Sequence, residues 1–110
     1  KTCIVIDDIC DTAGSLVAGC EILKRHGAKD IYTGITHGVF SRDAIAKIEN
    51  SPIKKMIITD TIPLREEQKT NTTKIHVLSI AEMLANTIES IENHTPVSKV
   101  YEEYSFDSFK

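Results

Sequence analysis

The sequence predicts an α/β domain in which a mainly parallel sheet is flanked by helices. Short, continuous apolar runs, typical of strands covered on both faces, alternate with stretches whose apolar residues recur at helical spacing. Such alternation favours parallel strands joined by helices. The composition, with 41% hydrophobic and 26% charged residues, is that of an ordinary globular protein. No internal repeat or linker interrupts the 110 residues, so we expect one domain.

The first half of the chain contains two predicted strand–helix units. Residues 3–6 form the first apolar run, and a helical pattern follows from residue 12 or 13 to residue 26. Its last turn is basic, and Gly27 stands where a left-handed C-cap is favoured. Residues 31–36 predict the second strand, and Ser41 is placed to cap a second helix that ends near residue 50.

The second half predicts two more strands and a longer helix. The strands are residues 55–59 and 75–78, and the polar segment 63–74 between them is expected to be a solvated connection. Ser79 and Glu82 have the spacing of a capping box at the start of the last helix. The tail after Pro96 is expected to be irregular, with dispersed aromatic residues at Tyr101, Tyr104, Phe106 and Phe109.

Charge and cysteine content exclude several classes of protein. The formal net charge is −3, so no basic excess favours nucleic acid or an anionic membrane as a partner. No apolar run approaches the roughly 20 residues of a membrane span, and no signal peptide is visible. Three cysteines without a CxxC pair indicate buried free thiols rather than a disulfide framework or a zinc site. These features predict a cytoplasmic protein.

The strongest functional signal is the segment that follows the first predicted strand. The strand delivers two adjacent carboxylates, and a loop of small residues then opens a helix. Small residues and a helix N-terminus favour a phosphate, and the hydroxyls of Thr12 and Ser15 add donors. The carboxylates of Asp7 and Asp8 suit vicinal hydroxyls or Mg²⁺ instead. A sugar phosphate satisfies both ends, whereas the simpler alternative is a capped helix after an acidic turn.

This segment resembles the phosphoribosyl pyrophosphate loop of the type I phosphoribosyltransferase fold. The fingerprint is an apolar strand, two acids, two variable residues, Asp-Thr, two small residues and Ser or Thr. The matching residues are Asp7, Asp8, Asp11, Thr12, Ala13, Gly14 and Ser15. The resemblance implies that the two acids hold the ribose 2- and 3-hydroxyls and that the last five residues bind the 5-phosphate.

Two further segments are similar to ribose-phosphate pyrophosphokinases. They are residues 36–41 and residues 59–63, where Asp60 replaces the family's usual Asn. The resemblance implies a truncated carboxyl-terminal half of a two-domain enzyme. That enzyme transfers the pyrophosphoryl group of ATP to the 1-hydroxyl of ribose 5-phosphate with Mg²⁺, giving phosphoribosyl pyrophosphate and AMP. It also implies dimers assembling into hexamers, and catalytic residues upstream of this chain, which alone is expected to be inactive.

Several alternatives remain open from the sequence. A base-salvage phosphoribosyltransferase shares the loop, and a non-catalytic regulatory paralogue shares the fold. A phospho-acceptor receiver domain also places paired acids after its first strand, with Asp60 and Ser79 imitating two of its other residues. His37 is either a catalytic candidate or a residue that caps a strand end, and Asp60 is either functional or a turn residue.

Overall fold

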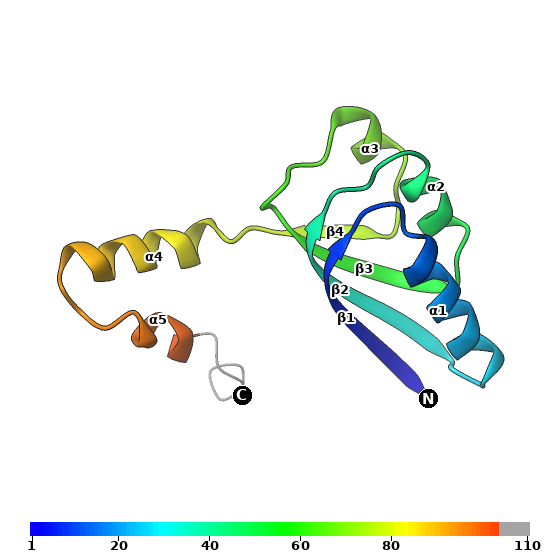
Figure 1. Cartoon of the computed structure of the whole chain (residues 1–110), viewed down its shortest axis with the longest axis horizontal. Helices are drawn as coiled ribbons and strands as arrows, with labels where there is room; N and C mark the ends of the chain where they lie inside the picture. Colours follow the sequence, from blue (N-terminus) through cyan, green and yellow to red (C-terminus); the bar gives the residue numbers. More distant parts are fainter. Residues whose placement is uncertain (104–110) are drawn as a thin grey trace. The chain divides into compact units, whose positions relative to one another are not determined.

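The computed structural model describes residues 1–103, which form two compact units: residues 1–78 and a second unit that begins at Ser79 (Figure 1). The first unit contains the sheet and the predicted site. The second contains helices α4 (Ala81–Glu92) and α5 (Ser98–Glu103). None of the helices in the described part of the chain has the length and apolar character needed to cross a membrane.

The first unit is built on a four-stranded sheet in the order β1-β2-β3-β4. The strands are β1 (Thr2–Cys10), β2 (Asp30–Gly38), β3 (Ile53–Thr59) and β4 (Ile75–Leu78). All three strand pairs are parallel, and one row across the sheet runs from Val5 through Thr33 and Met56 to Ile75. The predicted α/β class with a parallel sheet is therefore confirmed.

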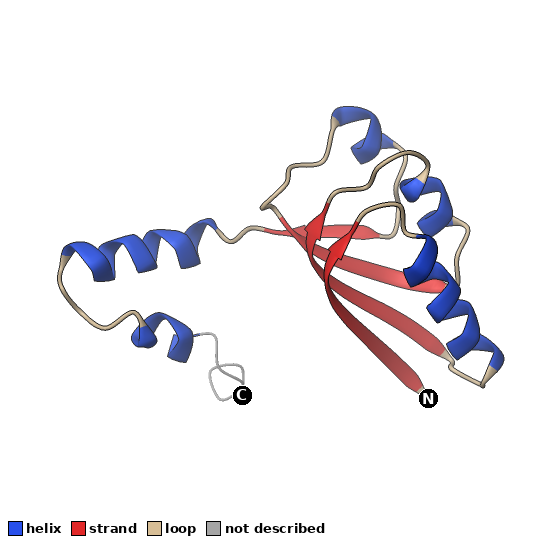
Figure 2. Ribbon diagram, in the orientation of Figure 1, coloured by secondary structure: helices blue, strands red, loops and turns tan. Residues whose placement is uncertain are grey.

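Three helices cover one face of this sheet (Figure 2). They are α1 (Gly14–Arg25), α2 (Ala44–Glu49) and α3 (Glu66–Thr70). The buried core includes isoleucine side chains from β2, β3 and α2, together with Phe40 and Met56. On β1, by contrast, Ile4 and Ile6 are 69% and 75% exposed. The core therefore lies on the helical side of the sheet.

Helix α1 ends as its sequence predicts. Gly27 has a φ of 97°, which L-residues with a side chain rarely adopt. Its N–H donates to Lys24 O at 3.1 Å, and the N–H of Ala28 donates to Leu23 O at 3.1 Å. This pair of bonds is a Schellman motif, so the predicted left-handed C-cap is confirmed.

Three local predictions differ from the structure. The segment expected to be a solvated connection is mostly exposed, but it also contains the short helix α3, whose Gln68 is buried. The capping box at Ser79 does not form: Ile80 is the N-cap of α4, and the Ser79 hydroxyl instead accepts a bond from Ala81 N–H at 3.1 Å. The tail is helical in α5 rather than irregular, while Tyr104, Phe106 and Phe109 lie outside the described residues.

Candidate functional site

The site lies where the strands end, because parallel strands bring their carboxyl ends to one edge of the sheet. Backbone hydrogen bonds join the loop after β1 to the loop after β2. Cys10 O accepts from Val39 N–H at 3.0 Å and from Phe40 N–H at 3.2 Å, and Asp11 O accepts from Ser41 N–H at 3.0 Å. Two segments that the sequence singled out separately are therefore one structural unit.

A small hollow of about 220 Å³ opens between the end of β1 and the start of α1. The lining includes every predicted site residue except Asp8; the lining residues are Asp7, Ile9, Cys10, Asp11, Thr12, Ala13, Gly14, Ser15 and Leu16. The predicted loop thus surrounds a cavity of a size suited to a small polar group.

The amino end of α1 forms one wall of the hollow. Ala13 is the N-cap and adopts a left-handed backbone with φ of 68°. The N–H of Val17 donates to Ala13 O at 2.9 Å, so the amides of Gly14, Ser15 and Leu16 precede the first helical hydrogen bond. No acidic residue occupies the first turn of α1. Free amides and the positive end of the helix dipole make this wall favourable to an anion.

The two adjacent acids do not have equivalent positions. Both are exposed and belong to β1, where neighbouring side chains point to opposite faces of the sheet. Asp7 lines the hollow and accepts a hydrogen bond from Asp8 N–H at 2.8 Å, whereas Asp8 does not line it. The structure therefore brings Asp7 to the loop and separates Asp8 from it.

The residues present fit a magnesium ion that is held mainly by its substrate. Within residues 1–103, no three His, Cys, Asp or Glu side chains form a cluster that could hold a metal. Mg²⁺, however, commonly binds through one or two carboxylates and completes its coordination with waters and substrate oxygens. Asp7 offers one such carboxylate at the hollow.

Cys10 lines the hollow as a neutral thiol. Its side chain is 4% exposed, and burial raises its pKa to about 11, with further contributions from the charges of Asp11 and Asp7. A thiol is a nucleophile or metal ligand only as the thiolate. Cys10 is therefore a packing residue under the loop rather than a reactive group.

The ends of β2 and β3 are joined by a network of hydroxyl groups. His37 Nδ1 lies 2.7 Å from Thr61 Oγ1, and Thr59 Oγ1 donates to Thr36 O at 2.6 Å. The backbone N–H of Asp60 donates to Leu78 O at 3.1 Å. His37 is not among the residues that line the hollow, and its hydrogen bond ties the end of β2 to Thr61 in the turn after β3.

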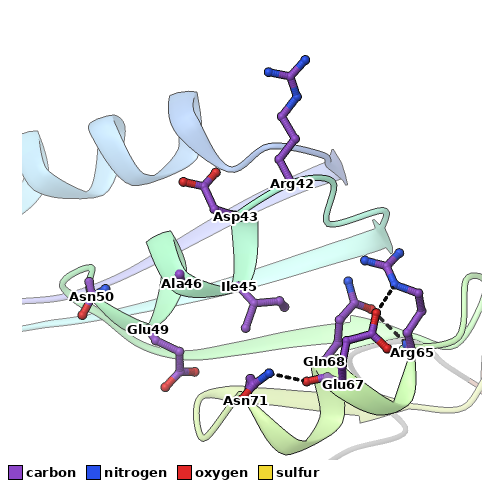
Figure 3. A pocket seen from close by; sticks show the side chains of 10 residues that line it. All are labelled: Arg42, Asp43, Ile45, Ala46, Glu49, Asn50, Arg65, Glu67, Gln68 and Asn71. Atoms are coloured by element: carbon purple, nitrogen blue, oxygen red, sulfur yellow. Dashed lines mark hydrogen bonds and ion pairs between the residues drawn. The ribbon is translucent and has the colours of Figure 1, made fainter.

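A larger groove of about 560 Å³ lies between α2 and α3 (Figure 3). Its charged lining carries three carboxylates and two guanidinium groups, from Asp43, Glu49, Glu67, Arg42 and Arg65. The Nε of Arg65 donates to Glu67 Oε1 at 2.7 Å, so one of the two cations is already paired. This mixed lining is less suited to a phosphate than the amide-rich hollow at α1.

Glu49, at the edge of this groove, is a structural carboxylate. Its oxygens accept bonds from the Thr72 hydroxyl at 2.7 Å, from the Thr73 hydroxyl at 2.8 Å and amide at 3.0 Å, and from the Lys74 amide at 3.2 Å. Burial raises the pKa of Glu49, but these hydrogen bonds outweigh it and hold the pKa below its usual value. The carboxylate therefore ties the end of α2 to the segment before β4.

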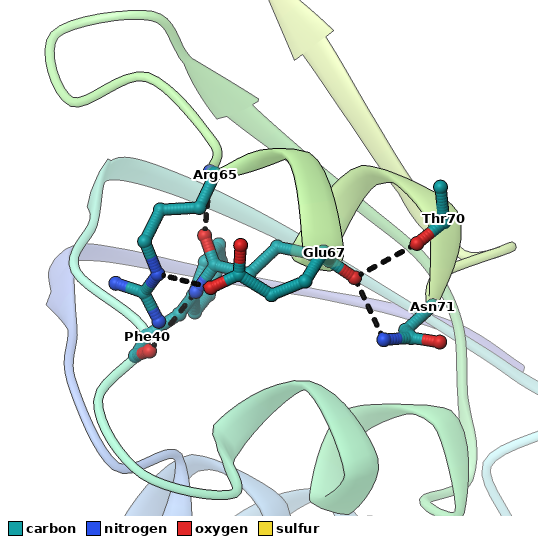
Figure 4. Close-up of polar contacts among 6 residues, drawn as sticks. Phe40, Arg65, Glu67, Thr70 and Asn71 are labelled. Atoms are coloured by element: carbon teal, nitrogen blue, oxygen red, sulfur yellow. Dashed lines mark hydrogen bonds and ion pairs between the residues drawn. The ribbon is translucent and has the colours of Figure 1, made fainter.

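The sequence did not reveal the role of Gln68, which is connected to the site by its hydrogen bond to the Phe40 carbonyl. Gln68 is 6% exposed; its Nε2 donates to Phe40 O at 3.2 Å, and its Oε1 accepts from Arg65 N–H at 2.9 Å. Figure 4 labels its two partners, Phe40 and Arg65. A Gln three residues after the helix N-cap is half of a capping-box pattern. That spacing was the available signal, but the polar composition of the segment concealed it.

Comparison with known proteins supports the fold and the family. The profile of the phosphoribosyl synthetase-associated domain matches residues 1–102. A ribose-phosphate pyrophosphokinase of Caldanaerobacter subterraneus subsp. tengcongensis is 48% identical over 101 residues, which are 92% of this chain and 31% of the relative. One from Clostridium acetobutylicum is 44% identical over 103 residues, covering 94% of this chain and 32% of the relative.

A solved structure agrees with these relatives. The crystal structure of phosphoribosylpyrophosphate synthetase from Mycobacterium smegmatis superimposes with a TM-score of 0.81 at 37% identity, over 86% of this chain and 31% of that one. The chain thus spans about a third of the length of the relatives that it matches, and the prediction of a carboxyl-terminal half is not confirmed. The match across residues 1–102 places the chain in the phosphoribosyl synthetase-associated domain family.

Proposed function

We propose that this chain is the ribose 5-phosphate-binding part of a ribose-phosphate diphosphokinase. The observation that carries the proposal is the hollow at the start of α1, which combines free helix amides with the Thr12 and Ser15 side chains. The names of the relatives, ribose-phosphate pyrophosphokinases, support this enzyme over a base-salvage phosphoribosyltransferase or a regulatory paralogue. The whole enzyme is a transferase that makes phosphoribosyl pyrophosphate and AMP from ATP and ribose 5-phosphate.

In this proposal each part of the loop has one task. Residues 11–15 bind the 5-phosphate through backbone amides and hydroxyls, because a dianion is stabilised at the amino end of a helix. Asp7 and Asp8 accept hydrogen bonds from the ribose 2- and 3-hydroxyls, which leaves the 1-hydroxyl free to attack the β-phosphorus of ATP. Asp7 and Asp8 are the residues that would hold Mg²⁺, which when bound would supply positive charge opposite the phosphate groups. The groups that act on the transferred phosphoryl group belong to parts of the enzyme outside this chain.

We also propose a location and an assembly for the whole enzyme. A cytoplasmic location and assembly into dimers and hexamers are inferred from the family resemblance. Activity then requires more of the protein than the third of its relatives' length that this chain spans.

The first test is calorimetric titration of ribose 5-phosphate into the chain with Mg²⁺, beside titration of unphosphorylated ribose. Gly14→Asp adds a negative charge to the hollow and should weaken ribose 5-phosphate binding by at least about tenfold, or about 1.4 kcal/mol. Gly14→Ala is a milder probe, because a Cβ at Gly14 would meet only Thr12 Oγ1, at 3.9 Å. Gly19→Ala is the matched control, since a Cβ there has nothing within 4 Å.

The outcomes separate the parts of the proposal. Binding that requires the phosphate, is lost in Gly14→Asp and persists in Gly19→Ala would support the loop as the phosphate site. Equal binding of ribose and ribose 5-phosphate, or binding unchanged by Gly14→Asp, would refute it. Asp7→Asn and Asp8→Asn test the diol: each should weaken binding, and the Mg²⁺ dependence should fall more with Asp7 because it lies at the hollow.

A further inference from the structure

Gln68 is the only buried residue of α3, and its amide connects two segments that lie far apart in the sequence. The Nε2 group donates to the carbonyl of Phe40, 28 residues away, at 3.2 Å. The Oε1 atom accepts from Arg65 N–H at 2.9 Å, which caps the start of α3. One side chain thus acts as donor in one direction and acceptor in the other, because an amide carries an NH2 donor and a carbonyl acceptor on the same carbon.

The carbonyl that Gln68 holds belongs to the peptide segment supporting the phosphate loop. Phe40 N–H donates to Cys10 O at 3.2 Å, and the next amide, Ser41 N–H, donates to Asp11 O at 3.0 Å. Phe40 has a left-handed backbone with φ of 52° and a fully buried side chain. Because that backbone conformation is unfavourable for a residue with a side chain, the contacts around Phe40 must maintain it.

We propose that Gln68 is a positioning residue for the phosphate loop. It fixes the Phe40 carbonyl, and thereby the Phe40 and Ser41 amides that hold the carbonyls of Cys10 and Asp11, two residues that line the hollow. This role rests on the proposed function, and it assigns loop ordering to a helix whose residues do not line the hollow. Without the amide, residues 39–41 loosen, and the start of the 11–15 loop loses its support.

The first experiment needs no ligand and therefore tests the positioning role alone. Gln68→Glu keeps the acceptor for Arg65 N–H but replaces the donor to Phe40 O with a carboxylate. Amide hydrogen exchange at Phe40 and Ser41 should accelerate by about tenfold, as expected from one lost hydrogen bond and an unsatisfied carbonyl. Glu67→Gln is the matched control: it alters the Arg65 ion pair on the same helix and should leave these amides unchanged.

The residues at which amide exchange accelerates show whether Gln68 positions the loop or stabilises the whole sheet. Acceleration confined to residues 39–41 and the 11–15 loop supports the proposal. Equal acceleration across the sheet, or none at Phe40 and Ser41, overturns it. Gln68→Met, which matches the volume of Gln68 but removes both bonds, serves where the carboxylate prevents folding and should give the same local pattern.

The second experiment measures ribose 5-phosphate binding in the same variants. At pH 7, Gln68→Glu should weaken the affinity for ribose 5-phosphate by several-fold. Near pH 4.5 the difference in affinity between the variant and the unaltered protein should shrink, because a protonated Glu carboxyl again donates to Phe40 O. Weakening without recovery at low pH contradicts a role that depends on this donor. Failure of the unaltered protein to bind ribose 5-phosphate would refute the proposed function, while the exchange pattern would still decide the role of Gln68.

Discussion

Replacing Gly38 with alanine would place a methyl group where the ring of Phe40 now lies. A Cβ built on Gly38 would stand 2.6 Å from Phe40 Cε2, 2.8 Å from Cζ and 3.2 Å from Ile58 Cδ1. The Phe40 side chain is 0% exposed and the Ile58 side chain is 1% exposed, so neither has free space to move into. Because ordinary van der Waals contact begins near 3.4 Å, the ring must move by several tenths of an ångström.

The expected cost follows from this geometry. Adding one methyl group to a well-packed core typically destabilises a protein by about 1–3 kcal/mol. We expect the upper part of this range, about 2–3 kcal/mol, because the backbone of Phe40 is also held by Cys10 and Gln68. Gly19→Ala, in the exposed middle of α1, should instead stabilise the chain by about 0.5–1 kcal/mol through helix propensity.

Urea unfolding followed by circular dichroism measures both free energies, and hydrogen exchange at Ser41 reports the local change. Gly38→Ala should lower the midpoint and accelerate exchange at Ser41 beyond the global effect, because the Phe40 ring and its backbone move together. A Gly38→Ala protein within about 0.5 kcal/mol of the original would show that the 39–41 segment has room to relax. That result would refute the reasoning that this segment is tightly packed.

Three other properties can be measured on the same protein. The pKa of Glu49 is lower in the folded state than its unfolded value near 4.5, so its ionised carboxylate stabilises the folded state above that pH. This stabilisation is lost as the pH falls through the folded pKa. Glu49→Gln should therefore flatten the pH dependence of the free energy of unfolding below about pH 5. Cys10 should resist iodoacetamide at pH 8, since its pKa is about 11, while the half-buried Cys3 reacts faster; peptide mass mapping distinguishes the two. Ile31→Ala should lower the free energy of unfolding by about 2–5 kcal/mol, because Ile31 is 0% exposed. Ile6→Ala should lower it by well under 1 kcal/mol, because Ile6 is 75% exposed. Urea unfolding compares the two variants.

Much of the fold could be predicted because its signals are local. The continuous apolar runs of the strands and the helical spacing of α1 are visible within a few residues, and Gly27 marks the end of α1 in the sequence itself. The loop that lines the hollow was predictable for the same reason. Its residues are contiguous, so the predicted residues 11–15 line one hollow as a direct consequence of the strand–loop–helix order.

The missed features depend on contacts between distant segments or on the alternation of a strand. The polar residues around Gln68 resemble a loop, and only the Phe40 carbonyl, 28 positions earlier, explains why this side chain is buried. The separation of Asp8 from Asp7 follows from β1 continuing to Cys10. The apolar run at residues 3–6 alone predicts a strand that ends before the acids, and in such a strand–loop junction the two carboxylates would be equivalent.

The residue choices at positions 13 and 14 are difficult to explain by the fold alone. Ala13 has the left-handed backbone, a conformation that glycine adopts more easily, although its buried methyl group gives some compensation in the core. Gly14 belongs to helix α1, where glycine is unfavourable, and a Cβ there would meet only Thr12 Oγ1, at ordinary contact distance. The backbone alone therefore favours glycine at 13 and alanine at 14, the reverse of the sequence. Under the proposed function this order has a reason, because a methyl group at position 14 would crowd a phosphate bound at the Gly14 amide.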